Sequence, residues 1–498
     1  MRNVFSPQLS IGQIDITDIV IDVSSRDDIP LLLLGLQHLY SNRLVRDAVF
    51  KILAKVAPTK AEDEATTLVS LDKGRPGMDQ WRILVLGSLR LALNADYDRI
   101  QELANQHKTL REMLGHSGFA DDYRYRLQTV KDNLKLFTPE LMQRINVEVV
   151  RAGHQALGIH PQAILHGRCD SFVLKTLVHF PTDSNLLYDA IRKLIEGCVK
   201  WSESHPIAGW RQHAYHLRQF KKQYRRLQTL KHSTSKDPVK KAAKQLEIEQ
   251  AYQDYLDLAQ AHLDRARLSL NTLQKDHAVP AEWLAELNDF CQHAARQIDQ
   301  IGRRVLQGET IPHGEKVFSL FQPHTEWISK GKAGVPVELG LRVCILEDQH
   351  GFILHAAVMQ KTTDDQVAVP MVEAAQTHFP QLKSCSFDKG FHSPNNQQGL
   401  AERLDQVVLP KKGKLSQADR ERETAPEFKR LRRQHAAVES AINALEVHGL
   451  DVCPDHGIDG FERYVALAVL SRNIQQLGAI KRQQERQRLA DEKRKQVA

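Results

Sequence analysis

Ser384-Cys-Ser-Phe-Asp-Lys-Gly-Phe-His-Ser-Pro-Asn395 predicts a buried strand that ends on a carboxylate and turns directly into a helix. Cys385 and Phe387 form a short apolar run of the kind found in buried strands. Gly390 and Pro394 then predict a turn and the start of a helix. Asp388 is therefore expected at the exposed end of a strand, in a rigidly fixed position.

Two further acidic residues fit the same pocket. Glu439 ends the stretch Arg432-Arg-Gln-His-Ala-Ala-Val-Glu439, where Val438, Ile442 and Leu445 recur at helical spacing. We expect Glu439 on this helix, bordering its buried face rather than facing bulk water. Asp170 lies in Ile164-Leu-His-Gly-Arg-Cys-Asp-Ser-Phe-Val-Leu-Lys-Thr176, which alternates as a strand does.

Three carboxylates from two strands and a helix would form an oxygen-rich pocket. Such a pocket suits Mg²⁺ or Mn²⁺, because these ions prefer oxygen ligands. Two bound ions can activate a hydroxyl and stabilise the leaving oxygen in phosphodiester chemistry. Asp and Glu occupy 61 positions, so a set of three acidic residues can be chosen in many ways. The residues alone therefore support no more than a metal-dependent nuclease.

The chain resembles the bacterial insertion-sequence DDE transposases, ISNCY-like members above all, from about residue 74 to 477. The resemblance rests on the order Asp170, Asp388, Glu439 and on Cys169-Asp-Ser-Phe-Val173, His179-Phe-Pro-Thr-Asp-Ser184, Phe321-Gln-Pro-His-Thr325, Gly331-Lys332, Phe387-Asp-Lys-Gly-Phe391 and Val438-Glu439. It implies an RNase H-like catalytic core, DNA cleavage and strand transfer, and metal held by the three carboxylates. It also implies double-stranded DNA as partner, both transposon ends and target, with at least a homodimer on DNA.

The chain departs from the family around the last carboxylate. Many cut-and-paste relatives carry a Tyr-x2-Arg-x3-Glu-x6-Lys signature there. With its Glu placed on Glu439, the other three positions hold Arg432, His435 and Glu446. The resemblance therefore leaves open the strand-transfer route, including whether a hairpin forms on the excised end.

Composition excludes a disordered or membrane-spanning chain. The 498 residues are 42% hydrophobic and 26% charged, as in soluble proteins of two to four domains. The net charge of +7 permits a polyanionic partner without proving one. Six scattered cysteines, no secretory pattern and an apolar run (29–36) too short to span a bilayer predict a cytoplasmic protein.

The N-terminal part is expected to be mostly helical. Residues 1–73 combine a predicted strand, Ile14 to Val23, with helices, and their role is unclear. Residues 74–150 predict short helices with Arg99, Lys108 and Arg111 exposed, which fits a helix-turn-helix or an ordinary helical bundle. The resemblance favours a DNA-binding helix-turn-helix, extended by a basic, aromatic surface from Tyr123 to Lys131.

The catalytic core is expected to be interrupted. Its first part, 151–199, carries Asp170 and a reserve carboxylate, Asp183, whose simpler role is to cap the next helix. Residues 200–309 form a helical insertion with two apolar seams typical of an antiparallel coiled coil, which we interpret as packing. Before the seams, cations alternate with aromatic residues, as in a phosphate-binding surface or a solvated helix: Arg211, Arg218, Lys221, Lys222, Arg225 and Arg226.

The second part of the core, 310–480, predicts strands at 316–321, 338–346 and 352–359, then alternating helices and strands. This order predicts an α/β fold with a mixed sheet. Asp364 and Asp365 are interpreted as helix caps. A set of basic residues in this part of the chain has two interpretations: they contact phosphate, or they are solvated surface residues. They are Lys389, His392, Lys411, Lys412, Lys414, Arg432, Arg433 and His435.

A charged tail, 481–498, receives no function. Two alternative functions remain for the whole chain. The first alternative is a transposase-derived DNA-binding protein that has lost catalysis. The second is a scaffold built around the coiled coil.

Overall fold

The computed structural model describes residues 3–6, 8–55, 77–119, 121–329 and 336–497. These residues form a mixed α/β structure that is 61% helical and contains a mixed sheet of seven strands. The chain divides into two compact units, which are described separately: residues 1–177 with 328–498, and Val178–Trp327. The predicted boundary at residues 73 and 74 and the Gly331-Lys332 motif fall outside the described residues.

The sheet is built around one long central strand, β1. The strands are β1 (Leu165–Thr176), β2 (Glu326–Ser329), β3 (Val337–Glu347), β4 (Ile353–Met359), β5 (Leu382–Phe387), β6 (Gln406–Val408) and β7 (Val452–Cys453). The order is β2-β3-β1-β5-β6, with β4 also on β3 and β7 also on β1. Because β3 runs antiparallel to β1 and β4 while β1, β5 and β6 are parallel, the sheet is mixed.

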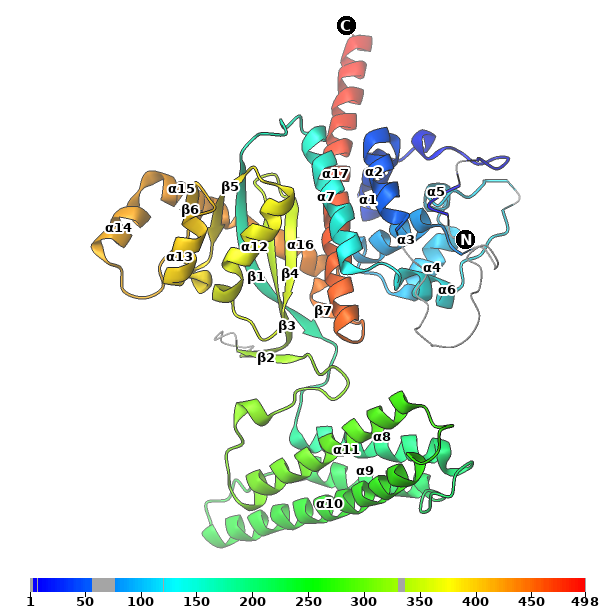
Figure 1. The fold of residues 1–498 in the computed structure, drawn as a ribbon, viewed down its shortest axis with the longest axis vertical. Coiled ribbons are helices and arrows are strands. Elements are labelled where there is room, and N and C mark those ends of the chain that lie inside the picture. Colours follow the sequence, from blue (N-terminus) through cyan, green and yellow to red (C-terminus); the bar gives the residue numbers. More distant parts are fainter. Residues whose placement is uncertain (1–2, 7, 56–76, 120, 330–335, 498) are drawn as a thin grey trace. The chain divides into compact units, whose positions relative to one another are not determined.

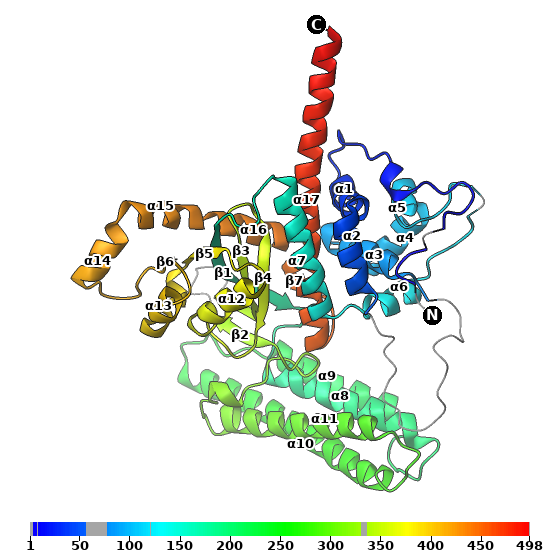
Figure 2. The same cartoon turned by 45° about the horizontal axis from the view of Figure 1, so that its top comes forward.

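Helices cover both faces of this sheet (Figures 1 and 2). On one face, α12 (Asp364–His378) and α13 (Pro394–Ala401) share a hydrophobic cluster with Cys169 and Phe387. On the other, α16 (Ala437–Leu445) and α17 (Ile458–Val497) share a cluster with Phe172. In the sequence, α14 (Gln417–Thr424) and α15 (Pro426–His435) come between α13 and α16. Three further one-turn elements are η3 (His313–Glu315), η4 (Lys389–Phe391) and η5 (Glu446–Leu450).

The N-terminal helices and the sheet lie on either side of α17 (Figure 1). The N-terminal elements are η1 (Ile16–Asp18), α1 (Asp28–Ser41), α2 (Arg43–Leu53), α3 (Gln80–Ala92), α4 (Tyr97–Gln106), α5 (Lys108–Met113), α6 (Leu127–Leu134) and α7 (Pro139–Ala156). Apolar residues of α1, α3 and α7 share one core with α17. Residues 16–53, for which the sequence predicts no role, therefore belong structurally to this core.

The second unit is a helical bundle. Its elements are α8 (Asp183–Ser202), α9 (His213–Thr229), α10 (Pro238–Leu273), α11 (Ala281–Ile301) and η2 (Gly302–Leu306). The predicted seams are buried on α10 and α11, but α8 and α9 share the same apolar core. The coiled-coil hairpin is thus half of a four-helix arrangement.

Two predicted strands are wrong. Residues 14–23 contain only the turn η1, because Asp15 accepts a hydrogen bond from the Thr17 amide and closes a turn there. Residues 316–321 are irregular, and the edge strand forms later, at β2. Within the described ranges, no helix is long and apolar enough to cross a bilayer.

Candidate active site

Asp170 and Asp388 are neighbours on two parallel central strands. Cys169 of β1 is in register with Phe387 of β5, so the next position on each strand is an aspartate. Side chains alternate between the faces of a sheet, and residues in register share a face. The fold therefore brings together two carboxylates that are far apart in the sequence.

Both aspartates are anchored in the same way. The backbone N–H of Ser171 donates to Asp170 Oδ1 over 2.7 Å, and that of Lys389 donates to Asp388 Oδ1 over 2.6 Å. Burial, with the nearby carboxylates Asp388, Asp364 and Glu439, raises the pKa of Asp170 to about 6, although the Ser171 hydrogen bond opposes the shift. Asp170 is thus held in a place where its negative charge is unfavourable without a cation.

Glu439 lies on α16, which packs against β1 beside Asp170. Its side chain is exposed, so the expectation that it avoids bulk water is wrong. Val438 and not Glu439 takes the buried position. One turn earlier, His435 Nδ1 lies 3.0 Å from Ser386 Oγ, and burial holds the pKa of His435 below its usual value.

Asp364 is the residue of this cluster that the sequence interpretation missed. Thr363 is the N-cap residue of α12 and forms a capping box with Gln366, so Asp364 is not the cap. Instead Asp364 Oδ1 accepts a hydrogen bond from Ser171 Oγ over 2.7 Å. A Cβ at Gly390 would lie only 3.0 Å from Asp364 Oδ2, which places this carboxylate against the turn after Asp388.

The carboxylates are neighbours, but they are not gathered as metal ligands. Within the described part of the chain, no three His, Cys, Asp or Glu side chains are placed to hold an ion. The donor set itself, carboxylate oxygens beside a destabilised Asp170, fits a hard divalent cation. The residues thus fit Mg²⁺ in chemistry, although the described side chains are not arranged as a ligand set.

The predicted phosphate contacts of the first unit have different environments. Lys389 is exposed directly after Asp388, and His392 is half-buried. Lys411 is occupied by an ion pair with Asp419, whereas Lys412 and Lys414 are exposed. Arg432 and Arg433 are exposed on α15, with Arg432 Nη1 4.0 Å from Glu423 Oε2.

The basic segment of the second unit forms α9 and the two residues before it. Arg211, Arg218, Lys221, Lys222 and Arg225 are exposed, while Arg226 pairs with Asp254 at 2.9 Å. Of the aromatic residues between them, Phe220 is buried and Tyr224 is half-buried, whereas Tyr215 is exposed. Phe220 stacks on Tyr188 and on Tyr255, with ring centroids 5.8 and 4.8 Å apart.

The reserve carboxylate Asp183 belongs to this second unit. Thr182, not Asp183, caps α8. Asp183 instead accepts from Arg304 Nε over 2.7 Å.

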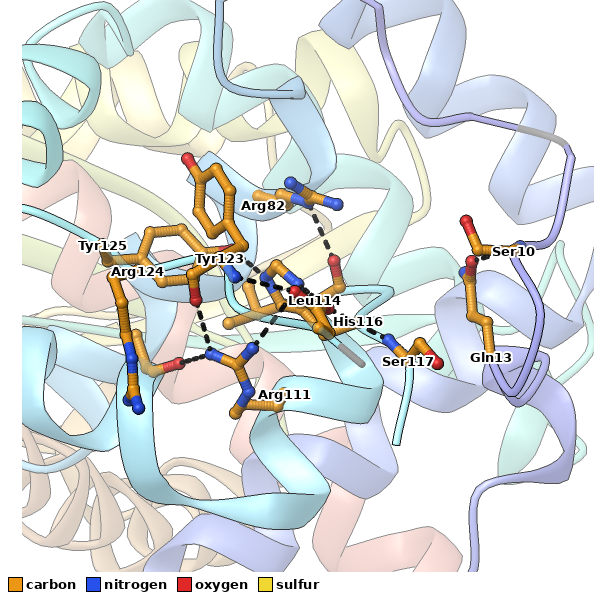
Figure 3. Close-up of polar contacts among 12 residues, drawn as sticks. Ser10, Gln13, Arg82, Arg111, Leu114, His116, Ser117, Tyr123, Arg124 and Tyr125 are labelled. Carbon is orange, nitrogen blue, oxygen red and sulfur yellow. Dashed lines mark hydrogen bonds and ion pairs between the residues drawn. The ribbon is translucent and has the colours of Figure 1, made fainter. Parts of the chain in front are cut away.

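The N-terminal helices have fewer exposed cations than the sequence predicts. Arg99 and Lys108 are exposed, but Arg111 is half-buried and its Nη1 donates to the carbonyl of Tyr123 (Figure 3). Tyr125 is buried and hydrogen-bonds to His116 over 2.8 Å. Part of the predicted basic, aromatic surface is therefore internal structure.

Comparisons with known proteins give no identification: no family model, no curated protein and no solved structure matches the chain. The fold and site define the class only as a mixed α/β protein with an acidic cluster at its central strands.

Proposed function

We propose that this chain is a DNA transposase of the DDE type, which binds insertion-sequence ends and carries out metal-dependent DNA cleavage and strand transfer. The observation that carries the proposal is the register of β1 and β5, which sets Asp170 beside Asp388. Glu439, the third residue of the predicted triad, comes from a helix packed on β1.

The strand order supports the RNase H-like core that the sequence resemblance implies. The path β4-β3-β1-β5-β6, with β3 antiparallel to its neighbours and the last three strands parallel, is the order expected of such a core. The helical unit interrupts the chain between β1 and β3, where the resemblance places an insertion.

Asp170, Asp388 and Glu439 would hold the divalent ions, Mg²⁺ or Mn²⁺. Bound there, such ions activate water or a 3′-hydroxyl and stabilise the leaving oxygen. A cation bound there would offset both the burial of the Asp170 charge and the repulsion from its neighbouring carboxylates, which together raise the pKa of Asp170.

The other residues position the DNA. Lys389, Lys412, Lys414 and Arg432 present exposed cations near or beyond the strand ends, and the α9 cations offer a second surface. Such contacts hold the phosphate backbone without reading sequence. Joining two ends requires at least two copies of the chain on DNA.

The direct test is cleavage of a labelled duplex that carries the DNA flanking the gene, in Mg²⁺. Glu439→Gln and Asp388→Asn should each lower the cleavage rate by at least about a hundredfold while leaving DNA affinity intact. Asp365→Asn is the matched control, since Asp365 is exposed beside the cluster and its carboxylate accepts from Thr363 Oγ1.

Cleavage that survives in Glu439→Gln would remove Glu439 from the site. Binding without cleavage by the native chain would favour the alternative of a transposase-derived DNA-binding protein. No binding at all would leave the scaffold alternative.

A further inference from the structure

A cavity of about 250 Å³ lies on the same sheet face as the acidic pair. Its lining includes His166, Arg168, Ser384, Ser386, Arg433 and Ala437, from β1, β5, α15 and α16. This volume is far larger than one water molecule needs and is close to the lower end of small-molecule sites. Arg433 is already among the predicted phosphate contacts, but the cavity itself has no function assigned above.

The strand register fixes the cavity relative to the carboxylates. His166 is in register with Ser384, and Arg168 with Ser386. Asp170 and Asp388 form the next row on this face, and rows two residues apart are separated by about 6.6 Å. A polar, cationic cavity thus directly adjoins the acidic row.

The chemistry of the lining suits an oxyanion. Arg168 and Arg433 contribute cations, Ser384 contributes a hydroxyl donor, and the buried Nδ1 of His166 has no hydrogen-bond partner among the described residues. The Ser386 hydroxyl is already engaged with His435 and with the Gly167 carbonyl. The opposing charge is Glu347, whose Oε1 lies 3.2 Å from Arg168 Nε. Burial raises the pKa of Glu347 to about 7, so its negative charge is only partly present at neutral pH.

We infer that this cavity binds the sugar-phosphate of a nucleotide that neighbours the scissile phosphodiester in the same strand, with the phosphate held by Arg168 and Arg433. The inference rests on the proposed function, because it takes the acidic row as the place of cleavage. It assigns to the cavity the task of setting the register of the strand on the site.

The test uses thymidine 5′-monophosphate and thymidine as probes of the whole chain, by isothermal titration in EDTA so that no metal ion bridges phosphate to the carboxylates. The native chain should bind the monophosphate at least about tenfold more tightly than the nucleoside. Arg433→Gln should remove about tenfold of the monophosphate affinity. Ala437→Phe should abolish binding by filling the cavity.

Both substituted residues are exposed, so neither change disturbs the core. Lys429→Gln is the matched control, since it removes one charge from the same helix at an exposed position outside the cavity lining. Its monophosphate affinity should equal that of the native chain.

Equal affinity for nucleoside and monophosphate, no monophosphate binding, or unchanged binding by Ala437→Phe would each overturn the inference. The outcome is separable from that of the proposed function. Asp170→Asn should lose cleavage but keep monophosphate binding. A native chain that binds the monophosphate without cutting DNA would contradict the catalytic proposal and the placement of the nucleotide beside a scissile bond, whereas phosphate binding in the cavity would stand.

Discussion

Asp170 couples the stability of the fold to pH and to metal. Burial and neighbouring carboxylates raise its pKa from 3.8 to about 6, so the folded chain holds this proton more tightly than the unfolded chain. Well below pH 4 the residue is neutral in both states, so it does not change the free energy of unfolding. As pH rises from about 4 to 6, ionisation becomes progressively unfavourable to the folded state.

Asp170→Asn should therefore stabilise the chain at pH 7 by about 1–3 kcal/mol, and the gain should vanish toward pH 4. Urea unfolding at a series of pH values measures this difference. Mg²⁺ should stabilise the native chain at pH 7 but not the variant, because the variant lacks the charge that the ion neutralises. A pH-independent gain, or equal stabilisation of both proteins by Mg²⁺, would contradict the assignment; Asp365→Asn should show neither effect.

The sequence could place Asp388 at a strand end and Glu439 on a helix, because these positions follow from an apolar run and a helical repeat. It could not identify Asp364, because an acidic residue at the start of a helix resembles a cap whatever its carboxylate contacts. Only the tertiary contact with Ser171 distinguishes the two roles. The cavity beside Arg168 was equally hidden, since it is made by residues of β1, β5 and α15 that are distant in sequence.

Where α1 and α17 cross, glycines allow a very close approach of the two helix backbones. A Cβ on Gly478 would lie 1.8 Å from the carbonyl oxygen of Leu31, and a Cβ on Gly35 would lie 2.2 Å from that of Ile474. Both obstacles are backbone atoms, which cannot rotate away. The two helices can approach this closely only because both positions lack a side chain.

Gly478→Ala should cost about 3 kcal/mol or more, despite the higher helix propensity of alanine, because the helices must separate. Chemical unfolding measures the loss. Gly302→Ala is the matched control: its φ is helical and nothing lies within 4 Å of its Cβ, so it should be neutral or stabilising by up to about 1 kcal/mol. Equal effects of the two substitutions would show that the crossing does not constrain the fold.

Elements with a clear period were predictable and elements set by tertiary context were not. The strands predicted at 338–346 and 352–359 appear in the structure as β3 and β4. In contrast, Ile14 to Val23 alternates as a strand does but forms none. Its Ile16 and Ile19 are buried in the helical core, so the same apolar residues serve an irregular segment.

The division into two units separates the acidic cluster from the α9 cations along the chain. The carboxylates proposed to be catalytic belong to the sheet unit, whereas α9 belongs to Val178–Trp327, a bundle with its own apolar core. The sequence predicted the helices of this bundle and its basic segment. It could not show that Phe220 and Tyr224 of α9 are committed to packing while Tyr215 is exposed, because a phosphate-binding surface and a solvated helix have the same residue pattern.

The exposed cations of α9 lead to a prediction about the salt dependence of DNA binding. If they contact phosphates, the triple substitution Lys221→Gln, Lys222→Gln, Arg225→Gln should weaken binding to any duplex and lower the slope of log K against log salt by about 2.7, near 0.9 for each contact. Fluorescence anisotropy of a labelled duplex across salt concentrations measures the slope. The control, Lys240→Gln, Lys241→Gln, Lys275→Gln, removes the same charge from other exposed positions of the unit. A smaller slope in the α9 variant alone means that these cations contact phosphates locally. An equal loss of slope in both triple variants means that only the net charge acts. A flat slope in the native chain favours the scaffold alternative.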